Sequence, residues 1–261
     1  MDWLDALAKK PVRPSAAERM AVAYDAAGRG DYAAALEIWS ELAHAGLPRA
    51  QSNIGACFSE GLGVPRDLDL AERWLSLAAA AGDPIGQRNL ASLYFKGEGV
   101  AQDNARAQQL YRAAAEQGDA AAQDMLSWML LEAADAAESY DEARRWAEAA
   151  ATQGIASSMT RLGMMFHNAL GVPRDPVHAV LWWRRGASRG DGDAQAMLGA
   201  AYHLGAGLER DPVEAMVWLA RARDNGSPLA GQFYSAVRNS LSRNNIIEAE
   251  RRAELPLEQA P

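Results

Sequence analysis

Between residues 194 and 226, apolar side chains recur with the spacing of one face of an α-helix, in two successive segments. Glycines at positions 205 and 207 separate the segments, and glycine ends helices because it enters the left-handed conformation without a Cβ clash. The pattern therefore predicts a first helix that stops at this turn. Its apolar face consists of Met197, Leu198, Ala201 and Tyr202.

A second helix is predicted to begin at Asp211 and Pro212. The Asp211 carboxylate can accept hydrogen bonds from the free amides of the first turn. Pro212 suits the first helical position because no N–H is needed there. Gly226 is the expected end of this helix. Its apolar face consists of Ala215, Met216, Trp218, Leu219 and Ala222.

The same helix, turn and helix recur upstream every 36 residues. The terminal glycine returns at Gly190, Gly154, Gly118, Gly82 and Gly46. The position of Ala215 is alanine in every unit, and the position of Trp218 is apolar in every unit: Trp182, Trp146, Leu110, Trp74 and Ile38. A period of this length built from two helices indicates an α-solenoid, in which each unit buries its apolar face against its neighbours.

Two segments make the resemblance to a known family specific. They are LASLYFKGEGVAQD from Leu90 to Asp103 and LGMMFHNALGVPRD from Leu162 to Asp175. Both resemble Sel1-like repeats, longer-loop relatives of the tetratricopeptide repeat, and the resemblance extends from about Ala16 to Gly226. It implies an all-α fold, a right-handed superhelix of about six helix-turn-helix repeats. It also implies adaptors for protein complexes, often in bacterial signalling, envelope or secretion systems.

The ends of the chain depart from the repeat. We expect an N-terminal arm over residues 1–14, a first repeat of plain tetratricopeptide length over 15–46, and five Sel1-like repeats over 47–226. A C-terminal pair of capping helices over 227–254 and a loose tail over 255–261 follow. Trp3, Leu4 and Leu7 lie on one helical face of the arm, which either covers the first repeat as a lid or occupies a groove of this chain or of a partner.

The third Sel1-like repeat lacks the glycines of the internal turn. Residues 133–139 read AADAAES where the two preceding units have a Gly-x-Gly-Val turn. Without glycine, we expect its first helix to continue by a turn. The register is retained, since Ala143, Trp146 and Gly154 stand at the expected positions.

Composition narrows the class of partner. The chain has 261 residues, 49% of them hydrophobic, and a net charge of −8. An acidic chain argues against nucleic acid as the main ligand, because phosphate binding draws its affinity from lysine and arginine. No apolar run is long enough to span a membrane, and the N-terminal segment lacks the apolar core of a secretory signal. The single cysteine, Cys57, fits a reducing compartment, so we expect a cytoplasmic protein.

The resemblance places the first helices on the concave surface and buries the tryptophans of the second helices between layers. Alignment of the first helices then gives three inward rows, beginning at Ser52, Ala56 and Ser59. Trp128 stands out, because its row otherwise holds small residues or methionine. We therefore expect a groove for a helix or extended peptide with Arg88 and Asp124 as its polar rim. The alternative is that these groups are buried by the curvature of the stack. The predicted partner-binding residues are Arg88, Ser92, Phe95, Asp124, Trp128, Leu131, Met164, His167 and His203.

Evidence for chemistry in the sequence is weak. His167 and His203 share a row, but two histidines without a third ligand make a poor metal site. Cys57 adjoins an apolar helix face and reads as a core position. Cysteine-rich members of the family are linked to penicillin binding and β-lactam hydrolysis, and they carry a disulfide in each repeat, which one cysteine cannot form.

Two functions from different classes are therefore predicted. The first is a non-catalytic scaffold or adaptor, with no cofactor and no metal, that binds a peptide or helix of another protein. The second is a β-lactamase-like hydrolase or small-ligand receptor on the same repeat fold. Self-association through the terminal helices is a third, structural alternative. The sequence favours the adaptor.

Overall fold

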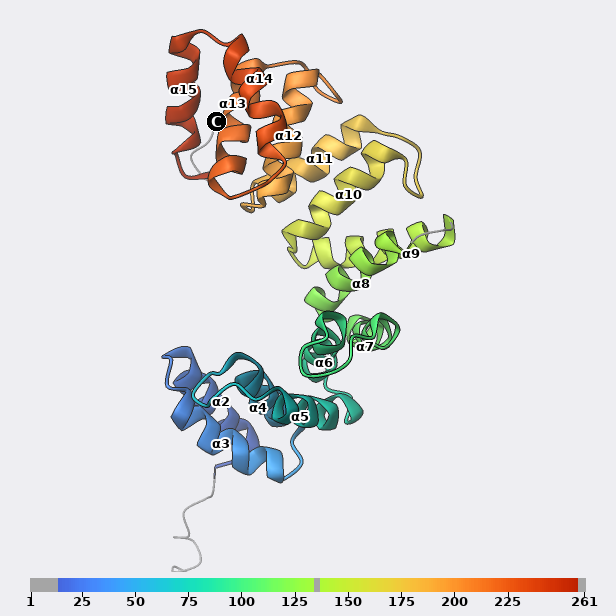
Figure 1. Ribbon diagram of the computed structural model, residues 1–261, viewed down its shortest axis with the longest axis vertical. Coiled ribbons are helices and arrows are strands. Elements are labelled where there is room, and N and C mark those ends of the chain that lie inside the picture. Colours follow the sequence, from blue (N-terminus) through green and yellow to red (C-terminus); the bar gives the residue numbers. More distant parts are fainter. Residues whose placement is uncertain (1–13, 134–136, 258–261) are drawn as a thin grey trace, which may run out of the picture. The chain divides into compact units, whose positions relative to one another are not determined.

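The computed structural model describes residues 14–133 and 137–257, and these residues form fourteen helices and no strand (Figure 1). The all-α prediction is confirmed. Trp3, Leu4 and Leu7 of the predicted arm lie outside the described residues. The chain divides into two compact units, residues 1–117 (unit 1) and 118–261 (unit 2).

Each unit is built from consecutive helical hairpins. Unit 1 contains α2 (Ala16–Gly28), α3 (Tyr32–His44), α4 (Pro48–Glu60), α5 (Leu68–Ala80), α6 (Pro84–Lys96) and α7 (Asn104–Glu116). Unit 2 contains α8 (Ala120–Glu132), α9 (Ala137–Thr152), α10 (Ala156–Asn168), α11 (Pro176–Ala187), α12 (Gly192–Leu204), α13 (Pro212–Asp224), α14 (Ala230–Ser240) and α15 (Arg243–Ala253). Even-numbered helices are the first helices of their hairpins, and each packs against the helix that follows it up to α13.

The predicted start and stop signals act as expected. The Asp211 carboxylate accepts hydrogen bonds from the amides of Val213 and Glu214, at 2.9 and 3.0 Å. Gly205 and Gly226 follow the last turns of α12 and α13 with φ of 69° and 76°, in the left-handed region. Both signals act on backbone groups that a helix end leaves without partners.

Ala169 occupies a position at which other hairpins have glycine. It follows α10 with φ of 58°, and it is the one non-glycine residue with positive φ in the described part of the chain. The left-handed conformation brings an alanine Cβ too close to the neighbouring carbonyl oxygen. This turn is therefore held in a strained conformation by the hairpin on either side.

The tryptophans of the second helices are less buried than the family resemblance implies. Trp74, Trp146, Trp182 and Trp218 are all half-buried. The residues that follow them occupy the centre of the hairpin, and Leu75, Ala147, Trp183 and Leu219 are between 0% and 3% exposed. The reason is helical geometry. The alanine that recurs in every unit and the residue four positions after it both face the first helix. The tryptophan lies three positions after the alanine, so its side chain points to one side of that contact.

Residue sizes are matched across two hairpins of unit 2. Gly163 of α10 faces the buried indole of Trp183, and Gly199 of α12 faces Leu219. A Cβ placed on Gly163 would lie 2.3 Å from the indole nitrogen, and one placed on Gly199 would lie 2.7 Å from Leu219 Cγ. Glycine in these first helices therefore makes room for the large residue opposite.

In the third Sel1-like repeat, the second helix is longer than in the other repeats, whereas the sequence predicted a longer first helix. α8 ends at Glu132 after 13 residues, like the other first helices. The additional turn belongs to the second helix, since α9 has 16 residues and begins at Ala137. The prediction of a longer first helix is therefore wrong. Residues 134–136 of the turn lie outside the described residues.

The last helix of unit 2 lies along α13 (Figure 1). Arg221 of α13, only 7% exposed, donates hydrogen bonds to the carbonyl oxygens of Arg252 and Leu255, at 2.9 and 2.8 Å. Arg252 also forms an ion pair with Glu214. Burial lowers the pKa of the Arg221 guanidinium. A buried cation thus satisfies carbonyl groups at the end of α15 and fixes that helix on α13.

Candidate partner-binding surface

Three members of the first predicted inward row do not face solvent. Ser52, Thr160 and Ala196 are 0%, 6% and 2% exposed, so the prediction is wrong for them. The Thr160 hydroxyl donates to Asp191 Oδ1 at 2.8 Å, and the Ser52 hydroxyl donates to Asp83 Oδ2 at 2.5 Å. Both acceptors cap the first helix of the next hairpin. At Ser52 and Thr160 this row connects successive first helices instead of lining a groove.

Asp124, predicted as part of a polar rim, belongs to this same connection. Its carboxylate accepts hydrogen bonds from Arg161 Nη1 at 2.6 Å and from Ser157 Oγ at 2.9 Å, and Ser158 Oγ is a third donor. The Asp124 and Arg161 side chains are only 17% and 12% exposed. Asp124 therefore fastens α10 to α8, and its carboxylate is already engaged within unit 2.

Arg88, Ser92 and Phe95 belong to α6 in unit 1 and are all half-buried. Arg88 Nε donates to Asn89 Oδ1 at 3.4 Å. Ser92 forms a hydrogen bond with Tyr111, whose hydroxyl pKa is raised by burial in spite of that bond. The remaining predicted residues, from Asp124 to His203, belong to unit 2.

In unit 2, the second and third rows contain exposed apolar side chains on neighbouring first helices. Trp128 of α8 is 36% exposed and Met164 of α10 is 40% exposed. Leu131 is half-buried against the apolar cluster around Met159 and Leu162. The face formed by α8, α10, α12 and α14 is called the first-helix face below; each of these helices contacts the next one in the series.

A cavity of about 290 Å³ opens on the first-helix face between α10, α12 and α14. It contains two of the predicted residues, Met164 and His167. The His167 ring packs against the Trp183 indole, with centroids 5.5 Å apart. Most of its lining is apolar: Met164, His167, Asn168, Trp183, Met197, Ala200, Ala201, Leu204, Ala206, Gln232 and Phe233.

Leu204 is the residue on this surface that the sequence analysis missed. It is the last residue of α12 and is 62% exposed. The equivalent positions of the other hairpins are polar: Glu60, Lys96, Glu132, Asn168 and Ser240. Alignment of the first helices would have revealed Leu204, because it is the one apolar residue among these equivalent positions.

The two aligned histidines contact different neighbours. His167 packs against Trp183, whereas the His203 ring lies 6.2 Å from the ring of Phe233. Within residues 14–133 and 137–257, no group of three or more His, Cys, Asp or Glu side chains has the arrangement of a metal site.

Cys57 is a core residue of unit 1, only 2% exposed, in the cluster with Trp39 and Ile54. Burial raises the pKa of its thiol to about 11. A nucleophilic cysteine needs a lowered pKa, because the thiolate is the reactive form. The environment of Cys57 thus has the opposite effect, in agreement with the core position predicted for it.

The repeat phase seen in the hairpins is also the phase of a known family. The family model of the Sel1 repeat matches residues 48–83, 84–119, 120–155, 156–191 and 192–227. The chain belongs to the Sel1 repeat family. Each matched segment begins at the first residue of a first helix, α4, α6, α8, α10 or α12.

Two solved structures extend the comparison. A protective antigen of uropathogenic Escherichia coli with an SLR fold is 29% identical over 94% of this chain, with a TM-score of 0.87. This chain spans 54% of that protein's length. A Sel1 repeat protein from Oxalobacter formigenes is 28% identical over 93% of this chain and 96% of its own length, with a TM-score of 0.81. No match was found among curated proteins.

These similarities confirm the predicted solenoid class of Sel1-like repeats. Sel1 repeat proteins are commonly scaffolds that bind other proteins, and the family is generally non-catalytic. In the described part of the chain, no helix combines the length and apolar character that crossing a bilayer requires.

Proposed function

We propose that this Sel1 repeat protein is a non-catalytic adaptor whose first-helix face in unit 2 binds a helix or extended segment of another protein. The observation that carries the proposal is the series Trp128, Met164 and Leu204 on α8, α10 and α12, exposed by 36%, 40% and 62%. Binding energy at interfaces concentrates in a few large side chains beside a pocket, and the cavity between α10 and α14 supplies that pocket.

The size and chemistry of this surface favour a polypeptide over a small substrate. The cavity of about 290 Å³ is at the lower limit of small-molecule sites, and its lining carries only a few polar side chains. It can accept one or two apolar side chains of a partner, while Trp128 and Leu204 contact residues further along the same segment. An amphipathic helix presents several apolar anchors along one face, as binding to a surface of this kind requires.

The setting of this function is also part of the proposal. Both solved relatives come from bacteria, which supports a bacterial source for this adaptor, and the family resemblance is the basis for a signalling or assembly pathway. The single buried cysteine supports the cytoplasm as the compartment. The negative net charge supports a protein partner over nucleic acid.

The test compares two leucines of similar exposure on different faces. Leu204 lies on the first-helix face, whereas Leu181 lies on α11, a second helix, and is 49% exposed. A photo-cross-linking amino acid at position 204 is expected to capture a defined partner in the native cell, and the same group at position 181 is expected not to capture it. Leu204→Glu and Trp128→Ala should then weaken binding of the purified partner by about tenfold or more each, the loss of one hot-spot side chain.

Controls separate binding from folding. Leu181→Glu should bind normally, and the thermal melt of Trp128→Ala by circular dichroism should stay close to that of the parent chain. A collapse of that melt would show that Trp128 is a core residue. Capture of the partner from position 181 instead of position 204 would place the interface elsewhere.

The hydrolase alternative is tested with the parent chain and the chromogenic β-lactam nitrocefin. If the protein is a non-catalytic adaptor, it should hydrolyse nitrocefin no faster than the background rate. Turnover that disappears on substitution of one titratable residue would contradict it.

Self-association through the terminal helices stays a prediction. Ile247 on α15 is 55% exposed and is the side chain through which such contact would be made. Light scattering on the parent chain and on Ile247→Glu tests it: a dimer mass that falls to the monomer mass in the variant supports self-association, and a monomer in both excludes it.

A further inference from the structure

A second cavity, of about 500 Å³, lies in unit 1 beside its second helices. It opens between the second helices α3 and α5 and is closed below by α4 and the turn that follows it. We call it the outer slot of unit 1. Its lining consists of Ala33, Leu36, Glu37, Ser40, His44, Ile54, Phe58, Gly63, Val64 and Trp74.

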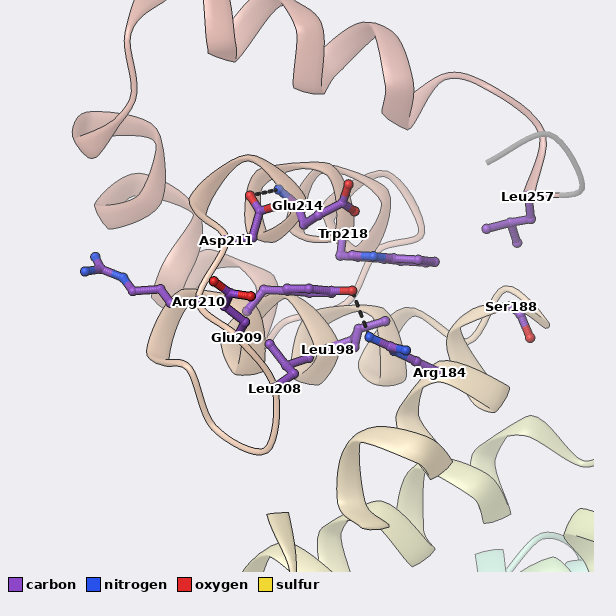
Figure 2. Close-up of a pocket in the computed structure, with 11 residues that line it drawn as sticks. Arg184, Ser188, Leu198, Leu208, Glu209, Arg210, Asp211, Glu214, Trp218 and Leu257 are labelled. Atoms are coloured by element: carbon purple, nitrogen blue, oxygen red, sulfur yellow. Dashed lines mark hydrogen bonds between the residues drawn. The ribbon is translucent and has the colours of Figure 1, made fainter. Parts of the chain in front are cut away.

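The same cavity recurs in unit 2, four repeats later in the sequence. It has about 750 Å³ and lies between the corresponding helices α11 and α13 (Figure 2). The equivalent lining residues are Ser40 and Arg184, His44 and Ser188, Ile54 and Leu198, Phe58 and Tyr202, Val64 and Leu208, and Trp74 and Trp218. The slot is therefore formed at the same position of two repeats, beside the half-buried Trp74 and Trp218.

In unit 2, a terminal segment of the chain contributes to this slot. Leu257, which follows α15, is half-buried and completes the lining. Figure 2 shows Leu257 on the same side of the pocket as Ser188 and the indole of Trp218. The chain thus uses one of its own leucines, from outside the repeats, to cover part of the slot.

The two slots differ in chemistry. The slot of unit 2 is rich in charged groups, among them Arg184, which donates to the Tyr202 hydroxyl at 3.0 Å, as well as Glu209 and Arg210. In unit 1, serine replaces Arg184, and the apolar side chains of Leu36, Val64 and Trp74 dominate. Its polar groups, Glu37, Ser40 and His44, lie on α3 alone. An occupant of the unit 1 slot should therefore bring aromatic or aliphatic side chains.

Residues 1–13, which lie outside the described residues, contain side chains of this kind, namely Trp3, Leu4 and Leu7. Arg19, in the second turn of α2, forms an ion pair with Glu41, in the last turn of α3. The chain therefore enters α2 beside the end of α3 at which Ser40 and His44 line the slot. Ten residues separate Leu4 from Pro14, a reach of up to about 35 Å, whereas α3 is only about 20 Å long.

We propose that Trp3, Leu4 and Leu7 occupy the outer slot of unit 1 and cover Trp74 there, as Leu257 covers part of the equivalent slot in unit 2. The alternative position for this segment is the outer face of α2, where Val22 and Tyr24 are 58% and 45% exposed. The experiment distinguishes the two positions.

The direct test is disulfide formation between Leu4→Cys and a second engineered cysteine in the full chain. The second site is Ser40→Cys in the slot, Val22→Cys on α2, or Gln109→Cys on the exposed side of α7 as a control for random encounter. Native Cys57 stays out of the reaction, because it is 2% exposed and its thiol pKa is raised to about 11. The reaction is followed by mass spectrometry at low protein concentration.

We expect the disulfide between positions 4 and 40 to form at least about tenfold faster than that between 4 and 109, because docking raises the effective concentration of the two thiols. Fastest formation with position 22 would mean that the segment covers α2. Equally slow formation at all three sites would mean that it does not dock. Disulfides formed only between two chains would mean that the slot takes the segment of a second copy. Each of these three results overturns the proposal.

Hydrogen exchange provides a second measurement without added cysteines. In a variant with Trp3→Ser, Leu4→Ser and Leu7→Ser, amides in residues 33–44 and 62–74 should exchange several-fold faster than in the parent chain, because the slot loses its cover. Exchange in unit 2 should stay the same. Unchanged exchange in residues 33–44 and 62–74 contradicts the proposal.

Discussion

Gly163→Ala adds one methyl group at the centre of a hairpin and tests whether residue sizes are matched there. The new Cβ would lie 2.3 Å from Nε1 and 2.4 Å from Cδ1 of Trp183. Carbon atoms in contact prefer a separation of about 3.5–4.0 Å, so the indole or the helix must move by more than about 1 Å. Trp183 is 3% exposed and is packed among Ala179, Val180 and Leu198, which leaves it little room.

Two opposing terms set the magnitude. Alanine is favoured over glycine inside a helix by about 1 kcal/mol. Overpacking of a filled core costs about 1–3 kcal/mol, and the upper end applies because a Cβ is fixed to the backbone and cannot turn away. We therefore expect Gly163→Ala to lower the free energy of unfolding by about 2 kcal/mol, which corresponds to a midpoint about 1 M lower in urea.

Gly231→Ala is the matched control. Gly231 is also helical, as the second residue of α14, but a Cβ placed on it meets no atom within 4 Å. This variant should be as stable as the parent chain or more stable by up to about 1 kcal/mol. Urea titration followed by far-ultraviolet circular dichroism compares the two variants. Equal midpoints would refute the size-matching argument.

A double substitution tests the cause of the effect. In a Trp183→Ala background, the methyl group of Gly163→Ala meets no indole, so the same change should become neutral or stabilising. A penalty of about 2 kcal/mol that persists in this background would show that the helix backbone, and not Trp183, is responsible. Trp183 also lines the cavity of the first-helix face, so Gly163→Ala should weaken partner binding as well.

Three further predictions concern single residues. Ala169→Gly should raise the free energy of unfolding by about 1 kcal/mol, measured by urea titration, because glycine relieves the strain of the positive φ of 58°. Arg221→Met removes two hydrogen bonds to carbonyl oxygens at the end of α15. The helix should lose about 2 kcal/mol of local stability, and hydrogen exchange of its amides should accelerate. Unchanged exchange would show that Arg221 does not hold α15 on α13. The pKa of Cys57, raised from 9.0 to about 11, favours the neutral thiol in the folded state, so its contribution to stability is complete below pH 9 and is lost as pH rises towards 11. Cys57→Ala should unfold with a weaker pH dependence in that interval, and equal slopes in thermal melts of variant and parent would refute this.

The repeat register was predictable because it depends on local signals. Asp211, Pro212 and the glycines act within one turn of chain, so the sequence alone places the ends of α12 and α13. Trp128 was predictable for a related reason. When the repeats are aligned, it is the one large aromatic residue in the row that begins at Ala56.

The orientation of each row relative to solvent depends on how successive hairpins are staggered, and no single repeat specifies that. Thr160 and Asp124 were expected on the open surface, but both take part in contacts between neighbouring first helices. The position of α15 could not be predicted from the sequence either, because the helix is mostly polar and its packing on α13 depends on one buried arginine of that helix, Arg221.

Two of the aspartates that start first helices, Asp83 and Asp191, each accept hydrogen bonds from two hairpins. Asp191 accepts a hydrogen bond from the Ala194 amide of its own helix and another from Thr160 of the preceding hairpin. Melting of α12 therefore deprives α10 of a contact, and the loss is passed on from one hairpin to the next, as in a nearest-neighbour chain. Ala196 has no hydroxyl at the position of Thr160, so the junction with α14 lacks this bond and relies on apolar packing with Ala230 and on a bond from Ser227 to Asp193. When unit 2 unfolds from its carboxyl end, the junction between α10 and α12 should therefore resist unfolding more than the junction between α12 and α14, because Asp191 bonds to both hairpins.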